Sequence, residues 1–172
     1  MTTVTKRARL LLALFILMSG VGCDQVTKQI AAQQLRGSPP LSFLSDTVRL
    51  HYTENRGAFL GLGNRLSPEL RFWILTVATA ALLVGLSAFL MLRWDTTHLS
   101  FIALSFVLAG GIGNMLDRVF HDGRVIDFLN LGLGPLRTGI FNVADIAITG
   151  GVVMLWIVSF RTRSESKEPA SS

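Results

Sequence analysis

Four long apolar runs constrain the fold of this chain more than any other feature. A bilayer is crossed by roughly 20 helical residues, and the runs predict spans at about 10–28, 70–92, 99–116 and 140–160. The first run is apolar only as far as Cys23, and it reaches spanning length by including the polar segment Asp24–Lys28. The sequence therefore predicts an α-helical integral membrane protein with four transmembrane helices.

Composition supports the bilayer as the solvent. Half of the residues are apolar, 16% are charged and the mean hydropathy is +0.50, which is unusual for a soluble protein. The lone cysteine, Cys23, excludes an internal disulfide and a multi-cysteine zinc site. The net charge of +5 is spread beside the apolar runs, without a basic face that interleaves aromatic residues. We therefore expect a single membrane domain, 1–172, with no nucleic-acid partner.

Positive charges at the span ends predict the orientation. Lys6, Arg7 and Arg9 precede the first span, and further basic residues follow the second and fourth spans. Because cytoplasmic loops carry an excess of Lys and Arg, both termini are predicted to be cytoplasmic. The outer loops are then 29–69 and 117–139, and 161–172 is a cytoplasmic tail. Both outer loops also carry arginines, so this prediction rests mainly on the cluster before the first span.

The outer loops contain two strand signals. Residues 47–53 alternate polar and apolar side chains with a period of two, as a half-buried strand does. Residues 125–128 form a weaker candidate, with Asp122-Gly123 before it and a glycine-rich stretch after it. A small β element above the helices is expected.

The N-terminus has an alternative interpretation. Basic residues, an apolar stretch and then Ser19-Gly20-Val21-Gly22-Cys23 are similar to a lipoprotein signal, in which Cys23 would become an acylated first residue. Three further spans would remain unexplained, and Gly20 fits such a cleavage site poorly. We therefore assign the segment to the first transmembrane helix.

Ionisable residues at membrane depth are costly, and by default they indicate function. Asp24 and Lys28 are four residues apart on one helix, where an ion pair is available, either as a structural pair or as part of a site. In the third span, Asn114, Asp117 and Arg118 share a face. Gly110, Gly111 and Gly113, which precede them, would permit close helix approach.

The fourth span carries a polar stripe of Asn142, Asp145 and Thr149, which we expect to face away from lipid. All these groups lie towards the outer helix ends, and the loop that holds Asp127 is short enough to fold back towards Asp145. Two carboxylates in a poorly hydrated site do not both ionise easily, so one holds a proton while the other acts as a base. From spacing alone, a structural network satisfied by Arg118 and the asparagines is an equal alternative.

These residues closely resemble the lipoprotein signal peptidase family, the type II signal peptidases of bacteria. Each motif alone is weak, but their combination in the family's order is specific. The matching segments are Asp24-Gln25-Val26-Thr27-Lys28, Asn55-Arg56-Gly57-Ala58-Phe59, Gly110-Gly111-Ile112-Gly113-Asn114-Met115-Leu116-Asp117-Arg118, Val125-Ile126-Asp127-Phe128 and Phe141-Asn142-Val143-Ala144-Asp145.

The resemblance implies an aspartyl endopeptidase of the bacterial inner membrane, with four transmembrane helices and a small β-sheet cradle on the outer face, where the active site lies. It implies cleavage just before the diacylglyceryl-modified cysteine of a prolipoprotein, without a metal or other cofactor. Asp127 and Asp145 match the catalytic positions. The positions that line or support the site are Asp24, Lys28, Asn55, Gly57, Asn114, Arg118 and Asn142. Prolipoproteins and membrane lipids are the expected partners of a monomer. Ile146 departs from the Ser or Thr that is frequent in the family.

Other functional classes are less well supported. The zinc motif HExxH and the GxSG and GxGD motifs do not occur, and His51, His98 and His121 are dispersed. A Mg-dependent membrane phosphotransferase is the enzymatic alternative, because carboxylates at a membrane surface also hold Mg²⁺. A small proton-coupled transporter is the other alternative, although its site should lie nearer the bilayer midplane.

Overall fold

The computed structural model describes residues 5–57 and 66–165, with side chains up to Arg161. Motif residues Ala58 and Phe59 and the last residues of the predicted tail lie outside this part. The helical elements are α1 (Lys6–Leu35), α2 (Pro68–Arg71), a π-helical segment η2 (Phe72–Ala78), α3 (Thr79–Leu92), α4 (His98–Phe120) and α5 (Val143–Glu165). Since α2, η2 and α3 are continuous, the described residues contain four helices that are long and apolar enough to cross a membrane. This confirms the four predicted spans.

Short polar residues fix where three of the helices begin. Thr5 caps α1 by accepting a hydrogen bond from the Ala8 N–H, and Thr97 caps α4 in the same way. Ser67 caps α2, whose first residue is Pro68. A side-chain oxygen at this position satisfies one of the backbone N–H groups that a helix start leaves without a partner.

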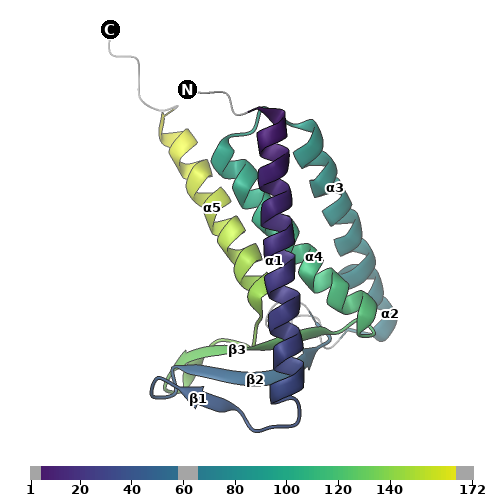
Figure 1. Ribbon diagram of the computed structural model, residues 1–172, viewed down its shortest axis with the longest axis vertical. Coiled ribbons are helices and arrows are strands. Elements are labelled where there is room, and N and C mark those ends of the chain that lie inside the picture. Colours follow the sequence, from purple (N-terminus) through teal and green to yellow (C-terminus); the bar gives the residue numbers. More distant parts are fainter. Residues whose placement is uncertain (1–4, 58–65, 166–172) are drawn as a thin grey trace.

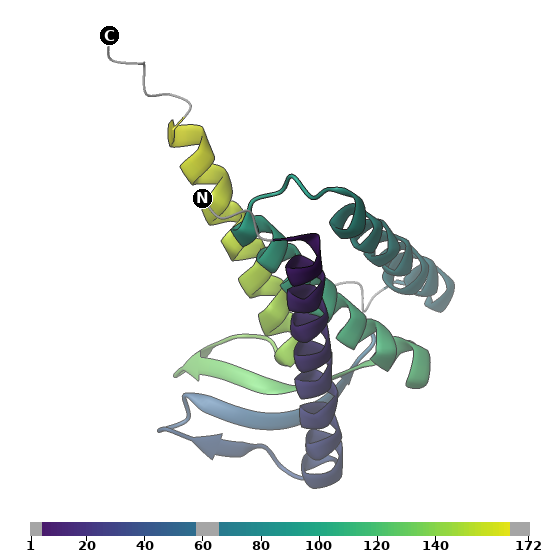
Figure 2. The same ribbon diagram turned by 45° about the horizontal axis from the view of Figure 1, so that its top comes forward.

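The α4 helix lies between the other helices (Figures 1 and 2). Leu83 and Leu90 of α3 pack on Phe101 and Leu108 of α4 in the core of the bundle. The α4–α5 contact is closer, because a Cβ added to Gly110 would lie 2.3 Å from the Ala144 carbonyl oxygen. A side chain at this glycine would therefore force the two backbones apart.

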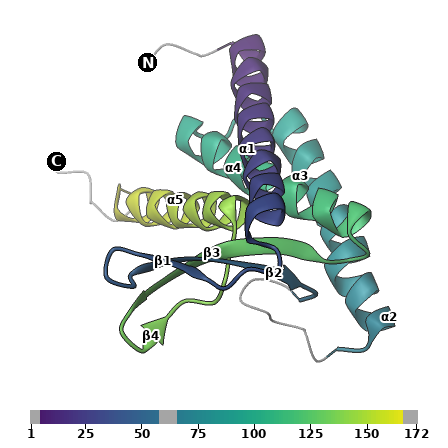
Figure 3. The same ribbon diagram turned by 60° about the horizontal axis from the view of Figure 1, so that its bottom comes forward.

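A four-stranded antiparallel sheet lies across one end of the bundle (Figure 3). Its order is β1-β2-β3-β4, and the strands are β1 (Leu41–Phe43), β2 (Val48–Asn55), β3 (Val125–Leu133) and β4 (Leu136–Arg137). The predicted small β element is thus confirmed, with a longer β3 than expected and with two short strands that the sequence did not indicate. The register pairs Thr53 with Asp127 and contains an irregularity between Leu50 and Thr53.

A separate apolar cluster attaches the sheet to α1. Ala31 and Leu35, in the last turns of α1, pack against Phe128 of β3, and Tyr52 of β2 joins them. This contact explains why α1 continues well beyond its apolar run. It also holds β3, and with it Asp127, against the helix ends.

Two helix boundaries change how the polar residues are related. The α4 helix continues to Phe120, so Asp117 and Arg118 are helical and not part of the outer loop 117–139. The α5 helix begins at Val143, so Asn142 precedes it.

The expected stripe through Thr149 is wrong, because this side chain is exposed. Close contacts to α4 are made by Ala144, Ile148 and Gly151. These residues follow the spacing i, i+4, i+7, and Thr149 lies off that face.

Candidate active site

The polar residues singled out in the sequence meet where α1, α4 and α5 reach the sheet. Most of them are buried: Asp24, Lys28, Asn114, Asp117, Asp127, Asn142 and Asp145. Asn55 of β2 joins them through a hydrogen bond to Asp127. The expected convergence of these side chains from separate elements is therefore present.

Asp127 lies within β3 and receives two amide hydrogen bonds. The Nδ2 atom of Asn142 donates to Oδ1 at 2.7 Å, and the Nδ2 atom of Asn55 donates to Oδ2 at 2.9 Å. Burial raises the pKa of Asp127 to about 6, an effect that the nearby charge of Asp145 increases and these two hydrogen bonds oppose. Asp127 therefore keeps its proton to a higher pH than an ordinary aspartate does, up to about pH 6.

Asp145 is positioned by the start of α5. Its N–H donates to Asn142 Oδ1 at 3.0 Å, and the Asn142 N–H donates back to Asp145 Oδ2 at 3.2 Å. This reciprocal pair is a capping box, which satisfies two free donors at the helix start. Asn114 Nδ2 donates to the other oxygen of Asp145 at 2.9 Å. Asn142 thus contacts both Asp127 and Asp145.

Lys28 orients the amide of Asn114. Its ammonium group contacts Asp24 Oδ2 at 2.8 Å, Asp117 Oδ2 at 2.9 Å and Asn114 Oδ1 at 2.9 Å. The three N–H bonds of the ammonium group match these three acceptors. Because Lys28 donates to the amide oxygen of Asn114, the amide NH2 is directed to Asp145.

Asp24 and Asp117 bind cationic and backbone donors instead. Asp24 Oδ1 accepts from the Ala144 N–H at 2.9 Å, which ties α1 to the first turn of α5. Asp117 Oδ2 accepts from the Ile126 N–H at 2.9 Å, which ties α4 to β3. Both carboxylates therefore join elements of the fold, and the Lys28 ammonium group lies between them.

Arg118 and Gly57 connect to the site through Asn55. Arg118 Nη2 donates to the Gly57 carbonyl at 3.4 Å, and the N–H of the buried Gly57 donates to Asn55 Oδ1 at 2.8 Å. With its oxygen engaged in this way, Asn55 presents its NH2 group to Asp127. Gly57 thereby contributes backbone groups to the site.

Sequence reasoning quoted Gln25 in the first motif without giving it a role in the site, and it missed Glu54. Gln25 Nε2 lies 3.1 Å from Asp117 Oδ1 and 3.2 Å from Asp24 Oδ2, so it joins the same buried network. The signal that could have indicated Gln25 is its position three residues before Lys28 on the same helix. Glu54 pairs with Arg36 and Arg124, and because these residues come from three separate segments, no local pattern indicated the contact.

The arrangement is suited to acid–base chemistry on water. Two carboxylates from different elements are linked by Asn142, through its side-chain NH2 to Asp127 and its backbone N–H to Asp145. In such a buried site, one proton between the two carboxyl groups is the favoured state. Among the described residues, no group of three His, Cys, Asp or Glu side chains is placed to hold a metal ion.

Comparisons with known proteins agree on one family. The family described as signal peptidase (SPase) II matches residues 16–161. The chain is similar to a lipoprotein signal peptidase of Mycobacterium bovis, with 33% identity over 90% of this chain and 72% of the relative. For a lipoprotein signal peptidase of Geobacillus thermodenitrificans, the identity is 29% over 81% of this chain and 84% of the relative.

A solved structure extends this likeness to the fold. A bacterial membrane enzyme determined at 2.3 Å by the in meso method covers 99% of this chain, and 98% of that chain is covered in turn. The TM-score is 0.77 and the identity is 27%. The comparisons do not support the phosphotransferase and transporter alternatives. The family match spans every motif from Asp24 to Asp145, and the chain belongs to the signal peptidase II family.

Proposed function

We propose that Asp127 and Asp145 are the catalytic pair with which this chain cleaves its substrates. As a member of the signal peptidase II family, the chain is an aspartic-type membrane protease that removes signal peptides from prolipoproteins. The observation that carries the residue assignment is the contact of Asn142 with both aspartates, at 2.7 Å to Asp127 and 3.2 Å to Asp145. The side-chain NH2 of Asn142 binds the Asp127 carboxyl group and its backbone N–H binds the Asp145 carboxyl group, so this one residue holds both in one buried site.

In the proposed mechanism, the ionised carboxylate takes a proton from a water molecule, and the water oxygen attacks the scissile carbonyl carbon. The protonated partner donates its proton to the carbonyl oxygen as the tetrahedral intermediate forms. The carboxyl group that gained the water proton then passes it to the leaving amine, and the C–N bond breaks. The second carboxylate recovers a proton from the intermediate as the new acid forms.

The remaining polar residues support this pair. Asn55, Asn114 and Asn142 donate hydrogen bonds to the two aspartates, which keeps their oxygens oriented in either protonation state. Arg118 is placed to bind a carbonyl or carboxylate oxygen of the substrate. Lys28 acts indirectly, because it fixes the Asn114 amide.

We further propose that the substrate carries a diacylglyceryl group on the cysteine that follows the cut. Burial of acyl chains among the spans contributes about 0.8 kcal/mol per methylene, so the membrane supplies much of the binding energy. A strong side-chain pocket is then unnecessary for specificity. We also propose that the protein acts as a monomer, because Asp127, Asp145 and the asparagines that bind them form a connected network within one chain.

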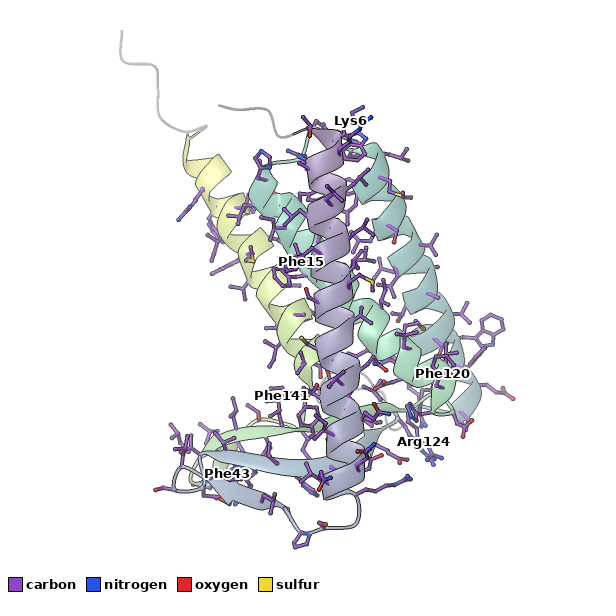
Figure 4. The ribbon with its side chains drawn as sticks, viewed as in Figure 1. Lys6, Phe15, Phe43, Phe120, Arg124 and Phe141 are labelled. Atoms are coloured by element: carbon purple, nitrogen blue, oxygen red, sulfur yellow. The ribbon has the colours of Figure 1, made fainter. Side chains whose placement is uncertain are left out.

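The proposed orientation places the sheet and the site at the outer face of the bacterial inner membrane, with both termini in the cytoplasm. It is supported by Lys6, Arg7 and Arg9, since α1 begins at the end of the bundle opposite the sheet (Figure 4). The positive-inside rule assigns that end to the cytoplasm.

The function is tested by incubating purified protein with a lipidated and an unlipidated form of one prolipoprotein. Mass spectrometry of the products should show a cut directly before the lipidated cysteine and little cleavage of the unlipidated form. Added EDTA should leave the rate unchanged, because the proposed chemistry uses no metal. Equal cleavage of both substrates would refute lipid dependence, and loss of activity in EDTA would refute the metal-free mechanism.

A further inference from the structure

A cavity of about 580 Å³ lies between the start of the second span and the end of α4, at the end of the bundle that carries the sheet. Its walls come from Arg56, residues 68–76 and residues 118–124. Figure 4 shows this region around Phe120 and Arg124, next to the start of the second span. The volume falls in the range of small-molecule sites.

The cavity is strongly basic. Its lining contains four arginines, which are Arg56, Arg71, Arg118 and Arg124, and the acidic residue in the same lining is Asp122. Glu54 lies behind Arg124 and pairs with its Nη1 atom at 2.6 Å. Counting both carboxylates, the guanidinium groups remain in excess, so the cavity attracts an anion.

Two of these guanidinium groups retain hydrogen-bonding capacity. The buried Nε atoms of Arg118 and Arg124 have no hydrogen-bond partner within the described part of the chain. The Nε and Nη edge of arginine matches two oxygens of one phosphate or carboxylate group. An anion with several oxygens would satisfy these donors.

One wall of the cavity is apolar. Phe72 and Leu75 of η2 and Val119 of α4 contribute to it, and the exposed fractions are 54% for Phe72 and 63% for Val119. Since these side chains belong to transmembrane helices, the wall continues the lipid-facing surface. The cavity therefore combines a charged end with an apolar flank.

We infer that this cavity binds the phosphate group of an anionic membrane phospholipid. The arginines hold the phosphate oxygens, and the glycerol and first methylenes lie along Phe72 and Leu75. Basic pockets between transmembrane helices are suited to such headgroups. Free phosphate would leave the apolar wall uncovered. A polypeptide backbone needs donors and acceptors in similar number, whereas the lining holds four arginines against one carboxylate, Asp122.

The site adjoins the active site through Arg118. This residue lines the cavity and also donates to the Gly57 carbonyl, which leads through Asn55 to Asp127. A phosphate bound to Arg118 therefore lies next to the network that positions Asp127. Its binding is nevertheless measurable without any substrate, so failure of the proposed proteolysis would leave this inference standing.

The inference is tested by lipid binding to the delipidated full chain in a neutral detergent. Native mass spectrometry with phosphatidylglycerol and phosphatidylcholine of equal chain length should show about tenfold tighter binding of the anionic lipid. The double variant Arg71→Gln/Arg124→Gln should weaken phosphatidylglycerol binding by about tenfold or more. Arg36→Gln is the matched control and should bind like the wild type, because Arg36 pairs with the same Glu54 at 2.9 Å but does not line the cavity.

Each other outcome would overturn the inference. Equal binding of the two lipids, or unchanged binding in the double variant, would exclude a headgroup site. Displacement of phosphatidylglycerol by an equal concentration of inorganic phosphate would indicate a simple anion site, and displacement by an unlipidated substrate peptide would assign the cavity to polypeptide. If the double variant does not fold, the lipid preference of the wild type decides the question.

Discussion

At the residue scale, the hydrogen-bond donors divide the four buried aspartates into two kinds. Asp24 and Asp117 are in direct contact with the Lys28 ammonium group. Asp127 and Asp145 accept hydrogen bonds from the side-chain amides of asparagines. These amides are uncharged, so they do not neutralise the negative charge of a carboxylate. A neutral environment favours one shared proton between two carboxyl groups, and this difference supports Asp127 and Asp145 as the pair.

Asn142 serves both the helix start and the aspartates, and two substitutions separate these roles. Asn142→Ser retains a good N-cap but loses the amide donor to Asp127, whereas Asn142→Ala loses both. Each variant should cleave about 100-fold more slowly, and the alanine variant should be about 1 kcal/mol less stable than the serine variant because it alone lacks the cap. Cleavage rates and thermal unfolding in detergent measure both effects. Wild-type turnover by the serine variant would show that the Asn142 side-chain NH2 is dispensable for cleavage.

The raised pKa of Asp127 predicts how stability depends on pH. Burial raises it from 3.8 to about 6, so the folded state favours the protonated form. The stabilisation from this group is complete below 3.8 and is lost as the pH rises through about 6. Asp127→Asn should therefore flatten the decline of the melting temperature over this interval. Parallel melting profiles of the wild type and the variant would contradict the raised pKa.

At the element scale, the sequence predicts the helices better than the sheet. The length of the apolar runs specifies the spans, and the alternation of polar and apolar residues in the sequence locates β2. The three residues of β1 and the two residues of β4 are too short to carry a pattern. Asp127 was predicted near Asp145, but the bridge by Asn142 depends on where α5 begins. If α5 began one residue earlier, Asn142 would lie within the helix and would not cap it.

The sequence signals for the site were similarly uneven. Asp24 and Lys28 were recognisable from helical spacing, and the structure adds their contacts to Asn114 and Ala144. Cys23, the basis of the alternative N-terminal interpretation, is exposed within the uninterrupted α1 helix. Tertiary contacts such as Glu54–Arg124 join residues 70 positions apart, and a single sequence carries no local signal for them.

Close packing of α4 on α5 makes Gly110 a sensitive position. Its added Cβ would meet the Ala144 carbonyl oxygen at 2.3 Å, whereas a Cβ on Gly150 of α5 would have nothing within 4 Å. Gly110→Ala should cost about 1–3 kcal/mol and slow cleavage, because α5 carries Asp145. Gly150→Ala is the control and should preserve both properties. Equal behaviour of the two variants in unfolding and cleavage assays would contradict this packing.

At the scale of the whole molecule, the bundle has two distinct ends. Both ends of the described chain lie away from the sheet (Figure 1), and the buried polar network lies beside the sheet. This polarity is suited to a reaction at one membrane surface, with lipid around the exposed apolar helix faces. It also makes the orientation directly measurable.

Orientation is tested with single cysteines in a Cys23→Ser background. Ser38→Cys follows α1 at the sheet end, and His98→Cys lies at the start of α4 at the opposite end; both positions are exposed. A membrane-impermeant maleimide should label Ser38→Cys in intact spheroplasts, and it should label His98→Cys only after the spheroplasts are lysed. The reverse pattern would place the active site in the cytoplasm.

The catalytic assignment of Asp127 and Asp145 is tested most directly by single-turnover cleavage of a lipidated prolipoprotein with purified Asp127→Asn and Asp145→Asn. Each substitution keeps the size of the side chain and one oxygen that accepts hydrogen bonds. The variants should therefore remain folded, as measured by circular dichroism, and should still bind substrate. Each should lose cleavage by a factor on the order of 10³ or more. Substantial turnover by either folded variant would contradict the catalytic pair.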